Sequence, residues 1–122
     1  MIKEVFLMIM MTGGGDVPVD ASFIEVENKT ECEERAAKAI AVFPAASIKY
    51  VSHNCVSSGI RFDDFLHNPE PTGPQYFFDL KFSENGEKLI SAKSYGSEKE
   101  CTDAHGAGCI VAYQNLRQNL LK

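Results

Sequence analysis

The sequence predicts an α+β fold, built on a mainly antiparallel sheet of about five strands with two helices packed on one face. Three observations predict it: apolar segments of strand length, two helix starts with capping residues, and an Asn-Gly hairpin signal. The length of 122 residues suits one domain, so we assign 1–122 to a single domain. Apolar residues make up 44% and charged residues 24% of the chain, which argues against intrinsic disorder.

Five segments have the composition of β-strands. Residues 3–12 carry apolar side chains on both faces, which is typical of a central strand that is covered on both sides. Three methionines cluster in this segment, and core packing explains them better than a soft-metal site. The remaining strands are expected at 22–27, 47–56, 76–82 and 88–95. The Asn-Gly dipeptide between the last two indicates a tight hairpin.

Two helices are expected to cover this sheet. Thr30 and Glu33 have the spacing of a capping box, and the apolar residues after them recur at helical intervals until Pro44 ends the helix. A second helix is expected at about 110–121, because apolar residues in this segment also share one helical face.

A possible internal repeat connects the two halves of the chain. The segments 28–32 and 97–101 both follow a predicted hairpin, and both end in Glu-Cys. Ser97 and Glu100 repeat the capping-box spacing of the first helix start. These similarities suggest that a β-β-α unit is used twice, with the two hairpins merged into one sheet.

The charge distribution excludes two classes of partner. The net charge is −5, and the basic residues are scattered without forming a basic stripe. Nucleic-acid binding and attachment to an anionic membrane surface both need concentrated positive charge, so neither is expected. The apolar run from Val5 to Met11 is too short to span a bilayer, and Glu4 is atypical of a signal peptide, so a strand is predicted there.

The four cysteines allow three disulfide pairings. A helix that packs back on the following strand would bring Cys32 and Cys55 together, and closing that loop would stabilise the fold by about 3.5 kcal/mol. Cys101 and Cys109 could pair if the glycine-rich segment between them is a loop, whereas a helix would hold them about 12 Å apart. We therefore predict disulfides at all four cysteines, with free buried thiols as an alternative.

A metal site is a further alternative for the same residues. The Cys-x3-His-x3-Cys run at 101–109 includes Asp103, and His53 precedes Cys55 by two positions. Thiolates and imidazoles of this type bind zinc, but the Cys-x2-Cys spacing of common structural zinc sites does not occur. We predict no metal and no cofactor.

The N-terminal half resembles a group of known proteins. An apolar strand is followed by a Phe-bearing strand, a helix that opens with Glu-Cys, and a second cysteine about twenty residues later. The matching residues are Phe6-Leu7, Phe23, Glu31-Cys32, Ala36-Ala37 and Asn54-Cys55-Val56. Over residues 3–57 the chain resembles small exported, disulfide-containing proteins of Gram-negative bacteria. The resemblance implies a periplasmic or secreted domain and assigns no activity; a cytoplasmic location is the alternative.

No sequence motif predicts catalysis. A P-loop, a nucleophile elbow and a haem-attachment motif are all missing from the sequence, and its three histidines lie in no recognisable catalytic pattern. We therefore expect a non-enzymatic binding or accessory domain with a protein partner. The alternatives are a cytosolic inhibitor of another protein, encoded for example by a phage, and a metal-binding protein.

The best candidate for a partner-binding surface is the long irregular segment 57–74, which is rich in aromatic and proline residues. Long loops in compact domains are often functional, and exposed aromatic residues often anchor interfaces. The candidate residues are Phe62, Asp63, Asp64, Phe65 and Leu66. The alternative is that Phe62 and Phe65 pack under the sheet as part of the core.

Overall fold

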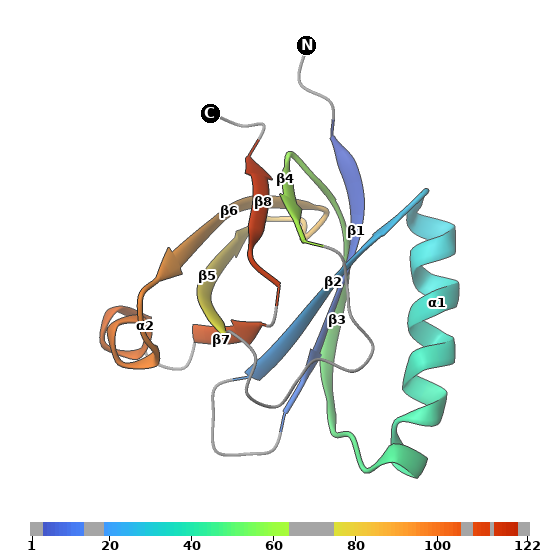
Figure 1. Cartoon of the computed structure of the whole chain (residues 1–122). Helices are drawn as coiled ribbons and strands as arrows, with labels where there is room; N and C mark the ends of the chain where they lie inside the picture. The colour runs from blue at the N-terminus through green and yellow to red at the C-terminus, as the bar shows by residue number, and fades with distance from the viewer. Residues whose placement is uncertain (1–3, 14–18, 64–74, 106–108, 113, 120–122) are drawn as a thin grey trace.

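The computed structural model describes residues 4–13, 19–63, 75–105, 109–112 and 114–119 (Figure 1). The elements in chain order are β1 (Val5–Thr12), β2 (Val19–Val26), α1 (Lys29–Val42), the 3-10 helix η1 (Pro44–Ala46), β3 (Tyr50–Ser58), β4 (Ile60–Phe62), β5 (Tyr76–Phe82), β6 (Lys88–Tyr95), α2 (Glu98–His105), β7 (Cys109–Ala112) and β8 (Leu116–Asn119). Both helices are too short and too polar to cross a membrane.

Six strands close into a barrel in the order β1-β2-β7-β5-β6-β3, and β3 pairs with β1 to complete it. β1 is antiparallel to both of its neighbours, whereas the β2–β7 and β3–β6 pairs are parallel. β4 and β8 form a separate two-stranded sheet. The prediction of a mainly antiparallel five-stranded sheet is therefore wrong, because parallel pairs between the two halves of the chain close a mixed barrel.

The positions of the helices also differ from the prediction. α1 packs against β1, β2 and β3, whereas α2 packs against β5, β6 and β7. The two helices therefore lie on different sides of the barrel and do not share one face of a sheet (Figure 1). Each helix covers the strands of its own half, since the chain connects each helix to those strands by short segments.

The helix predicted at 110–121 is also wrong, because this segment forms β7 and β8. All four residues of β7 are buried. A short run that is apolar on every side lacks the alternation of a half-exposed strand, so periodicity cannot distinguish it from a buried helix.

Two β-β-α-β units build the barrel: β1-β2-α1-β3 and β5-β6-α2-β7. The predicted repeat was β-β-α and did not include a third strand: a strand was predicted at 47–56, where β3 lies, but not at the position of β7. Both helices start alike: Asn28 Oδ1 accepts the N–H of Glu31 at 2.8 Å, and Ser97 Oγ accepts the N–H of Glu100 at 3.1 Å. The cap of α1 is therefore Asn28, and not Thr30 as predicted.

The interior of the barrel is filled by apolar side chains. Phe23 and Phe62 stack with ring centroids 3.7 Å apart, and Phe78 meets both rings edge-on at 6.3 and 5.7 Å. The buried residues of this cluster are Leu7, Ile9, Ala21, Phe23, Val56, Ile60, Phe62, Phe78, Leu89, Ile110 and Ala112. The interior therefore serves as a packed core, as in other small barrels.

A buried amide completes the hydrogen bonding of β2. β7 pairs with β2 only at Val19 and Asp20. Further along β2, Gln114 Oε1 accepts the N–H of Phe23 at 2.8 Å, and Gln114 Nε2 donates to the carbonyl of Phe23 at 2.7 Å. Nε2 also donates to the carbonyl of Asp63 at 2.6 Å. The side chain of Gln114 thus takes the place of a strand where β7 has ended, and it ties β2 to the end of β4.

A second apolar cluster lies between the barrel and α1. Met8 and Met10 of β1 are buried there against Cys32 and Ala36 of α1. This arrangement accounts for two of the clustered methionines as core residues, and it explains why β1 is apolar on both faces.

Candidate functional site

One disulfide in each unit links the helix to the third strand of that unit. Cys32 of α1 bonds to Cys55 of β3 with Cα atoms 5.9 Å apart, and Cys101 of α2 bonds to Cys109 of β7 with Cα atoms 5.7 Å apart. Both predicted pairs form, although Cys101 lies in a helix and not in a loop. The second pair can close because α2 ends before Cys109, which belongs to the next strand. Two disulfides are compatible with an oxidising compartment.

The repeat reveals an insertion in the first unit. The disulfide-bonded cysteines occupy equivalent positions in the two units. In the strand register, Cys55 lies opposite Met8, the fourth residue of β1, and Cys109 lies opposite Asp79, the fourth residue of β5. The bonded cysteines are separated by 23 residues in the first unit and by 8 in the second, so the first unit is longer by 15 (23 less 8). When the helices are aligned on Cys32 and Cys101, the last residue of α2 corresponds to Ala36 of α1. The extra residues are therefore 37–51, which we call the insertion.

The insertion carries most of the large apolar side chains that the described residues expose. It comprises the last part of α1, η1 and the start of β3, and no residue in it is buried. The part of the chain that the structure describes exposes five large apolar side chains, and four of them belong to the insertion. These four are Val42 at 60%, Ile48 at 41%, Tyr50 at 39% and Val51 at 45% exposed. Such clustering marks an interaction site more often than scattered exposed apolar residues do.

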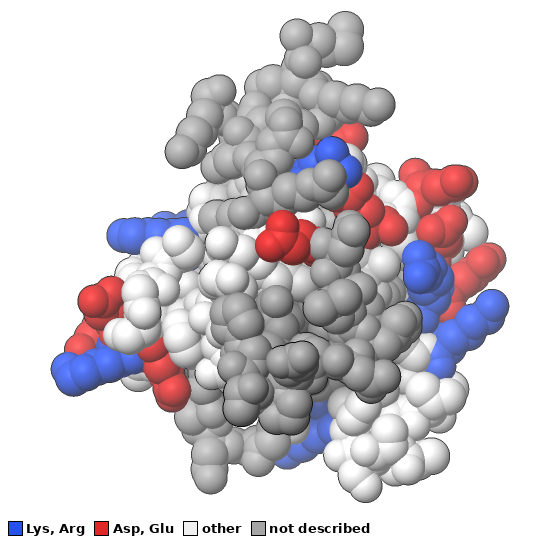
Figure 2. Space-filling model, in the orientation of Figure 1, with Lys and Arg blue, Asp and Glu red and all other residues white. Residues whose placement is uncertain are grey.

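The charge of the insertion differs from that of the whole chain. Its charged residues are Lys38 and Lys49, and it has no acidic residue, although the chain carries a net charge of −5. Figure 2 shows a mostly uncharged surface at the lower right, where Figure 1 places η1. The acidic side chains nearest in sequence, Glu31, Glu33 and Glu34, lie in the first two turns of α1. The insertion thus combines exposed apolar side chains with a weakly positive charge.

The insertion leads into a strand whose outer edge is not fully paired. β3 pairs with β1 along its length, but it pairs with β6 only at Ser57 and Ser58. Within the described residues, 50–56 have no strand partner on the side away from β1. This stretch contains neither proline nor lysine, which commonly protect strand edges from pairing. An extended segment could therefore add here by backbone hydrogen bonds.

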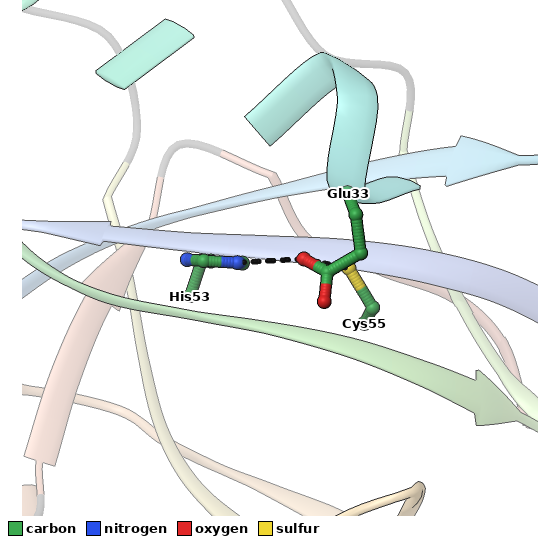
Figure 3. Close-up of side chains that lie close together, drawn as sticks. All are labelled: Glu33, His53 and Cys55. Carbon is green, nitrogen blue, oxygen red and sulfur yellow. Dashed lines mark hydrogen bonds and ion pairs between the residues drawn. The ribbon is translucent and has the colours of Figure 1, made fainter. Parts of the chain in front are cut away.

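A polar cluster lies between α1 and β3, next to the first disulfide (Figure 3). Glu33 reaches from α1 to β3, where its Oε1 is 2.9 Å from His53 Nε2 and 3.4 Å from Cys55 Sγ. The other ring nitrogen, His53 Nδ1, is 2.8 Å from the hydroxyl of Tyr50. Since a disulfide sulfur carries no proton, the contact between Cys55 and Glu33 is not a hydrogen bond. The carboxylate can only accept, so His53 donates from Nε2.

The second unit lacks this cluster. The positions equivalent to Glu33 and His53, counted from the bonded cysteines, are Thr102 and Ala107. The fold of a β-β-α-β unit therefore does not require the Glu33–His53 pair. Like the insertion, the pair is a feature of the first unit alone.

The structure changes the interpretation of the predicted partner-binding residues. Phe62 is only 3% exposed and stacks on Phe23 in the barrel, so the prediction that it anchors a partner is corrected: its ring is part of the core. Asp63 is exposed, and its backbone N–H donates to the carbonyl of Asn115 at 2.9 Å. The other three candidates, Asp64, Phe65 and Leu66, lie outside the described residues.

Neither the insertion nor the pairing of His53 with Glu33 was predicted. The only sequence signal was composition: 37–51 has two charged residues in a chain that is 24% charged. The predicted metal alternative at 101–109 depends on His105, whose side chain lies outside the described residues. Among the described residues, the group of potential metal ligands is Glu33, His53 and Cys55.

Comparisons with known proteins identify no relative of this chain. No family model, no curated protein and no solved structure matches it. Its function has to be inferred from the insertion and from the polar cluster.

Proposed function

We propose that this chain is an exported, disulfide-stabilised, non-enzymatic binding domain that holds a protein partner on the insertion. The observation that carries the proposal is that four of the five large apolar side chains exposed by the described residues lie in 37–51, which the second unit does without. Ala39, Ile40 and Phe43 of this segment pack against the cluster under α1, but the four exposed side chains do not. Since exposed apolar area costs solubility, covering of these four side chains by a partner accounts for them.

The partner that fits is a protein with an extended segment that is apolar and flanked by acidic residues. The edge of β3 at 50–56, which pairs with no strand of the described residues on the side away from β1, offers backbone donors and acceptors for strand addition. In this mode of binding, alternate side chains supply specificity. Ile48 and Val51 lie at the start of this edge and supply apolar contacts. Lys38 and Lys49 favour acidic residues at the ends of the bound segment, since the insertion has no acidic residue of its own.

Site-specific photocrosslinking in the native host tests this proposal. A benzophenone side chain replaces Val51 in the insertion or, as the matched control, Ile90 of β6, which is 52% exposed. The protein crosslinked from position 51 is identified and purified, and its affinity for the unmodified domain and for variants is measured by calorimetry. Val51→Asp should weaken binding about tenfold or more, because it removes apolar burial of about 1 kcal/mol and places a charge in the contact. Ile90→Asp should leave the affinity unchanged.

Several results would overturn the proposal. These are equal crosslinking from both positions, no product from position 51, and an affinity that Val51→Asp does not change. A crosslink to a second copy of the chain, or binding of the domain to anionic lipid vesicles that Val51→Asp abolishes, would replace the partner protein by another occupant.

The exported location is tested by counting free thiols. Protein from the native source is alkylated under denaturing conditions without reduction, and its intact mass is measured. All four cysteines are paired in the structure, so no added label is expected. Four labels would instead support the cytosolic inhibitor, because thiols stay reduced in the cytosol.

A further inference from the structure

We infer that reduction of the disulfide between Cys32 and Cys55 creates a zinc site, in which the two released thiolates bind the metal together with His53 and Glu33. The inference does not rest on the proposed partner binding, although both involve residues of β3 between 50 and 56. It starts from the position of the cluster, since a carboxylate and an imidazole lie beside Cys55, the less buried cysteine of a helix-to-strand disulfide (Figure 3).

The donor atoms already lie within the size of a metal site. Glu33 Oε1, His53 Nε2 and Cys55 Sγ are all within 4.8 Å of one another, and the sulfur of Cys32 is bonded to that of Cys55. Zinc prefers four ligands of these types, with Zn–S bonds of about 2.3 Å. In tetrahedral geometry the two sulfurs would be about 3.8 Å apart, and rotation about the Cα–Cβ bonds of the two cysteines can separate them.

Tyr50 supplies the outer partner that a zinc-bound histidine needs. In the oxidised protein His53 Nε2 donates to Glu33, so a neutral ring accepts at Nδ1 from the hydroxyl of Tyr50. When Nε2 binds a metal, the ring proton moves to Nδ1, and the hydroxyl can accept from it because it is both donor and acceptor. Such hydrogen bonds orient the imidazoles of zinc sites. Tyr50 can therefore serve both states without changing its position.

The redox and proton balance is complete with a thiol or phosphine reductant. Two thiols reduce the disulfide to two cysteine thiols and become a disulfide themselves. A phosphine does the same with one water, taking up the oxygen as a phosphine oxide while the two hydrogens go to the cysteine sulfurs. Zinc then replaces the two thiol protons, which leave to solvent, and His53 remains neutral. Before reduction the sulfurs carry no negative charge and cannot act as thiolate ligands, so the oxidised protein has no zinc site here.

The second disulfide lacks the equivalents of two of these ligands. Cys101 and Cys109 join a helix to a strand in the same way, but Thr102 and Ala107 stand where the first unit has Glu33 and His53. The other candidate ligands near this pair are Asp103 and His105, and the side chain of His105 lies outside the described residues. The first site is therefore tested with the second pair of cysteines replaced.

The test uses the full chain carrying Cys101→Ser and Cys109→Ser, so that the first pair is the only source of thiolates. After reduction with a phosphine, zinc binding is measured by competition with a chromophoric chelator, and Co²⁺ is used to detect the absorption of a tetrahedral thiolate site. One metal per chain is expected after reduction, and none before it. A further variant with Cys32→Ser and Cys55→Ser should bind no metal at this affinity.

Single substitutions identify the other two ligands. His53→Ala and Glu33→Gln should each weaken zinc binding by about tenfold or more, since outer-shell changes alone commonly cost that much. Glu34→Gln is the matched control, because this exposed carboxylate is the next residue of α1 and belongs to no metal-ligating group among the described residues. It should leave the affinity unchanged.

Far-UV circular dichroism is recorded throughout, since reduction could unfold the chain. Recovery of the folded spectrum on adding zinc would support the site, because metal binding and folding are coupled. The inference is overturned if the reduced protein stays unfolded in zinc, if it binds no tighter than the variant without cysteines, or if His53→Ala and Glu33→Gln both bind zinc normally.

Discussion

Replacing Gln114 by alanine tests the idea that one side chain holds β2 where β7 has ended. Gln114 is 4% exposed, and its amide makes three hydrogen bonds of 2.8, 2.7 and 2.6 Å to the backbone of Phe23 and Asp63. The substitution leaves one N–H and two carbonyls without these partners. At about 1 kcal/mol for each lost hydrogen bond, the free energy of unfolding should fall by about 3 kcal/mol.

Urea denaturation measures this loss. For a domain of this size an m-value of about 1.5 kcal/mol/M is typical, so the midpoint should fall by about 2 M urea. The surface control is Glu84→Ala in the turn before β6, where Glu84 is exposed, and it should change the stability by less than about 0.5 kcal/mol. A loss below about 1 kcal/mol for Gln114→Ala would refute the reasoning, since it would mean that other groups satisfy the backbone of β2.

The variant Gln114→Glu separates hydrogen bonding from packing, because the side chain keeps its size. A carboxylate would face the carbonyls of Phe23 and Asp63 with no hydrogen to donate, so at neutral pH the loss should exceed that of the alanine variant. Burial favours the protonated acid, which raises the pKa of the introduced carboxyl in the folded state. Stability should therefore recover as the pH falls toward about 4 and decline as it rises. Equal destabilisation at pH 4 and pH 7 would contradict this account.

Three further predictions concern the core, the helix starts and pH. Phe62→Ala should lower the free energy of unfolding by about 3–5 kcal/mol in urea denaturation, because the ring is 3% exposed and stacked on another ring. A loss below about 1 kcal/mol would contradict the placement of this ring in the core. Asn28→Ala and Ser97→Ala should each lower the stability by about 1 kcal/mol in thermal unfolding, since each removes a cap. Asp20 is exposed, but partial desolvation raises its pKa above 3.8, so the unfolding free energy should fall slightly as pH rises through the pKa of the folded state. Asp20→Asn should flatten this dependence in a pH series of denaturation curves.

The strands at 76–82 and 88–95 were predictable because their alternation and the Asn-Gly turn are local properties, and the structure places β5 and β6 at those positions. The start of α1 was predictable only to within one turn, because Asn28 and Thr30 both have side chains that can cap and only the backbone shows which one does. The strand at Cys109–Ala112 was not predictable, because burial on all sides removes the periodicity that distinguishes strand from helix.

The two candidate sites depend on long-range contacts to different degrees. The disulfides could be anticipated, since each links a helix to the next strand of the same unit. The Glu33–His53 pair could not, because it joins residues twenty positions apart whose relative positions depend on how α1 lies on β3. The sequence left open whether Phe62 anchors a partner or packs in the core, because it lies in a long segment predicted to be irregular; β4 directs its ring into the barrel.

By itself, the amino-acid sequence determined the local properties of this protein: which segments are strands of a hairpin, where α1 ends, and which cysteines could meet. Only the tertiary structure decided that two units close into one barrel, that 37–51 is an exposed insertion, and that a carboxylate and an imidazole meet beside a disulfide. The physical reason is that turns and caps depend on residues next to one another in the sequence. Parallel strand pairing and the exposure of a side chain depend instead on contacts between segments that are far apart in the sequence.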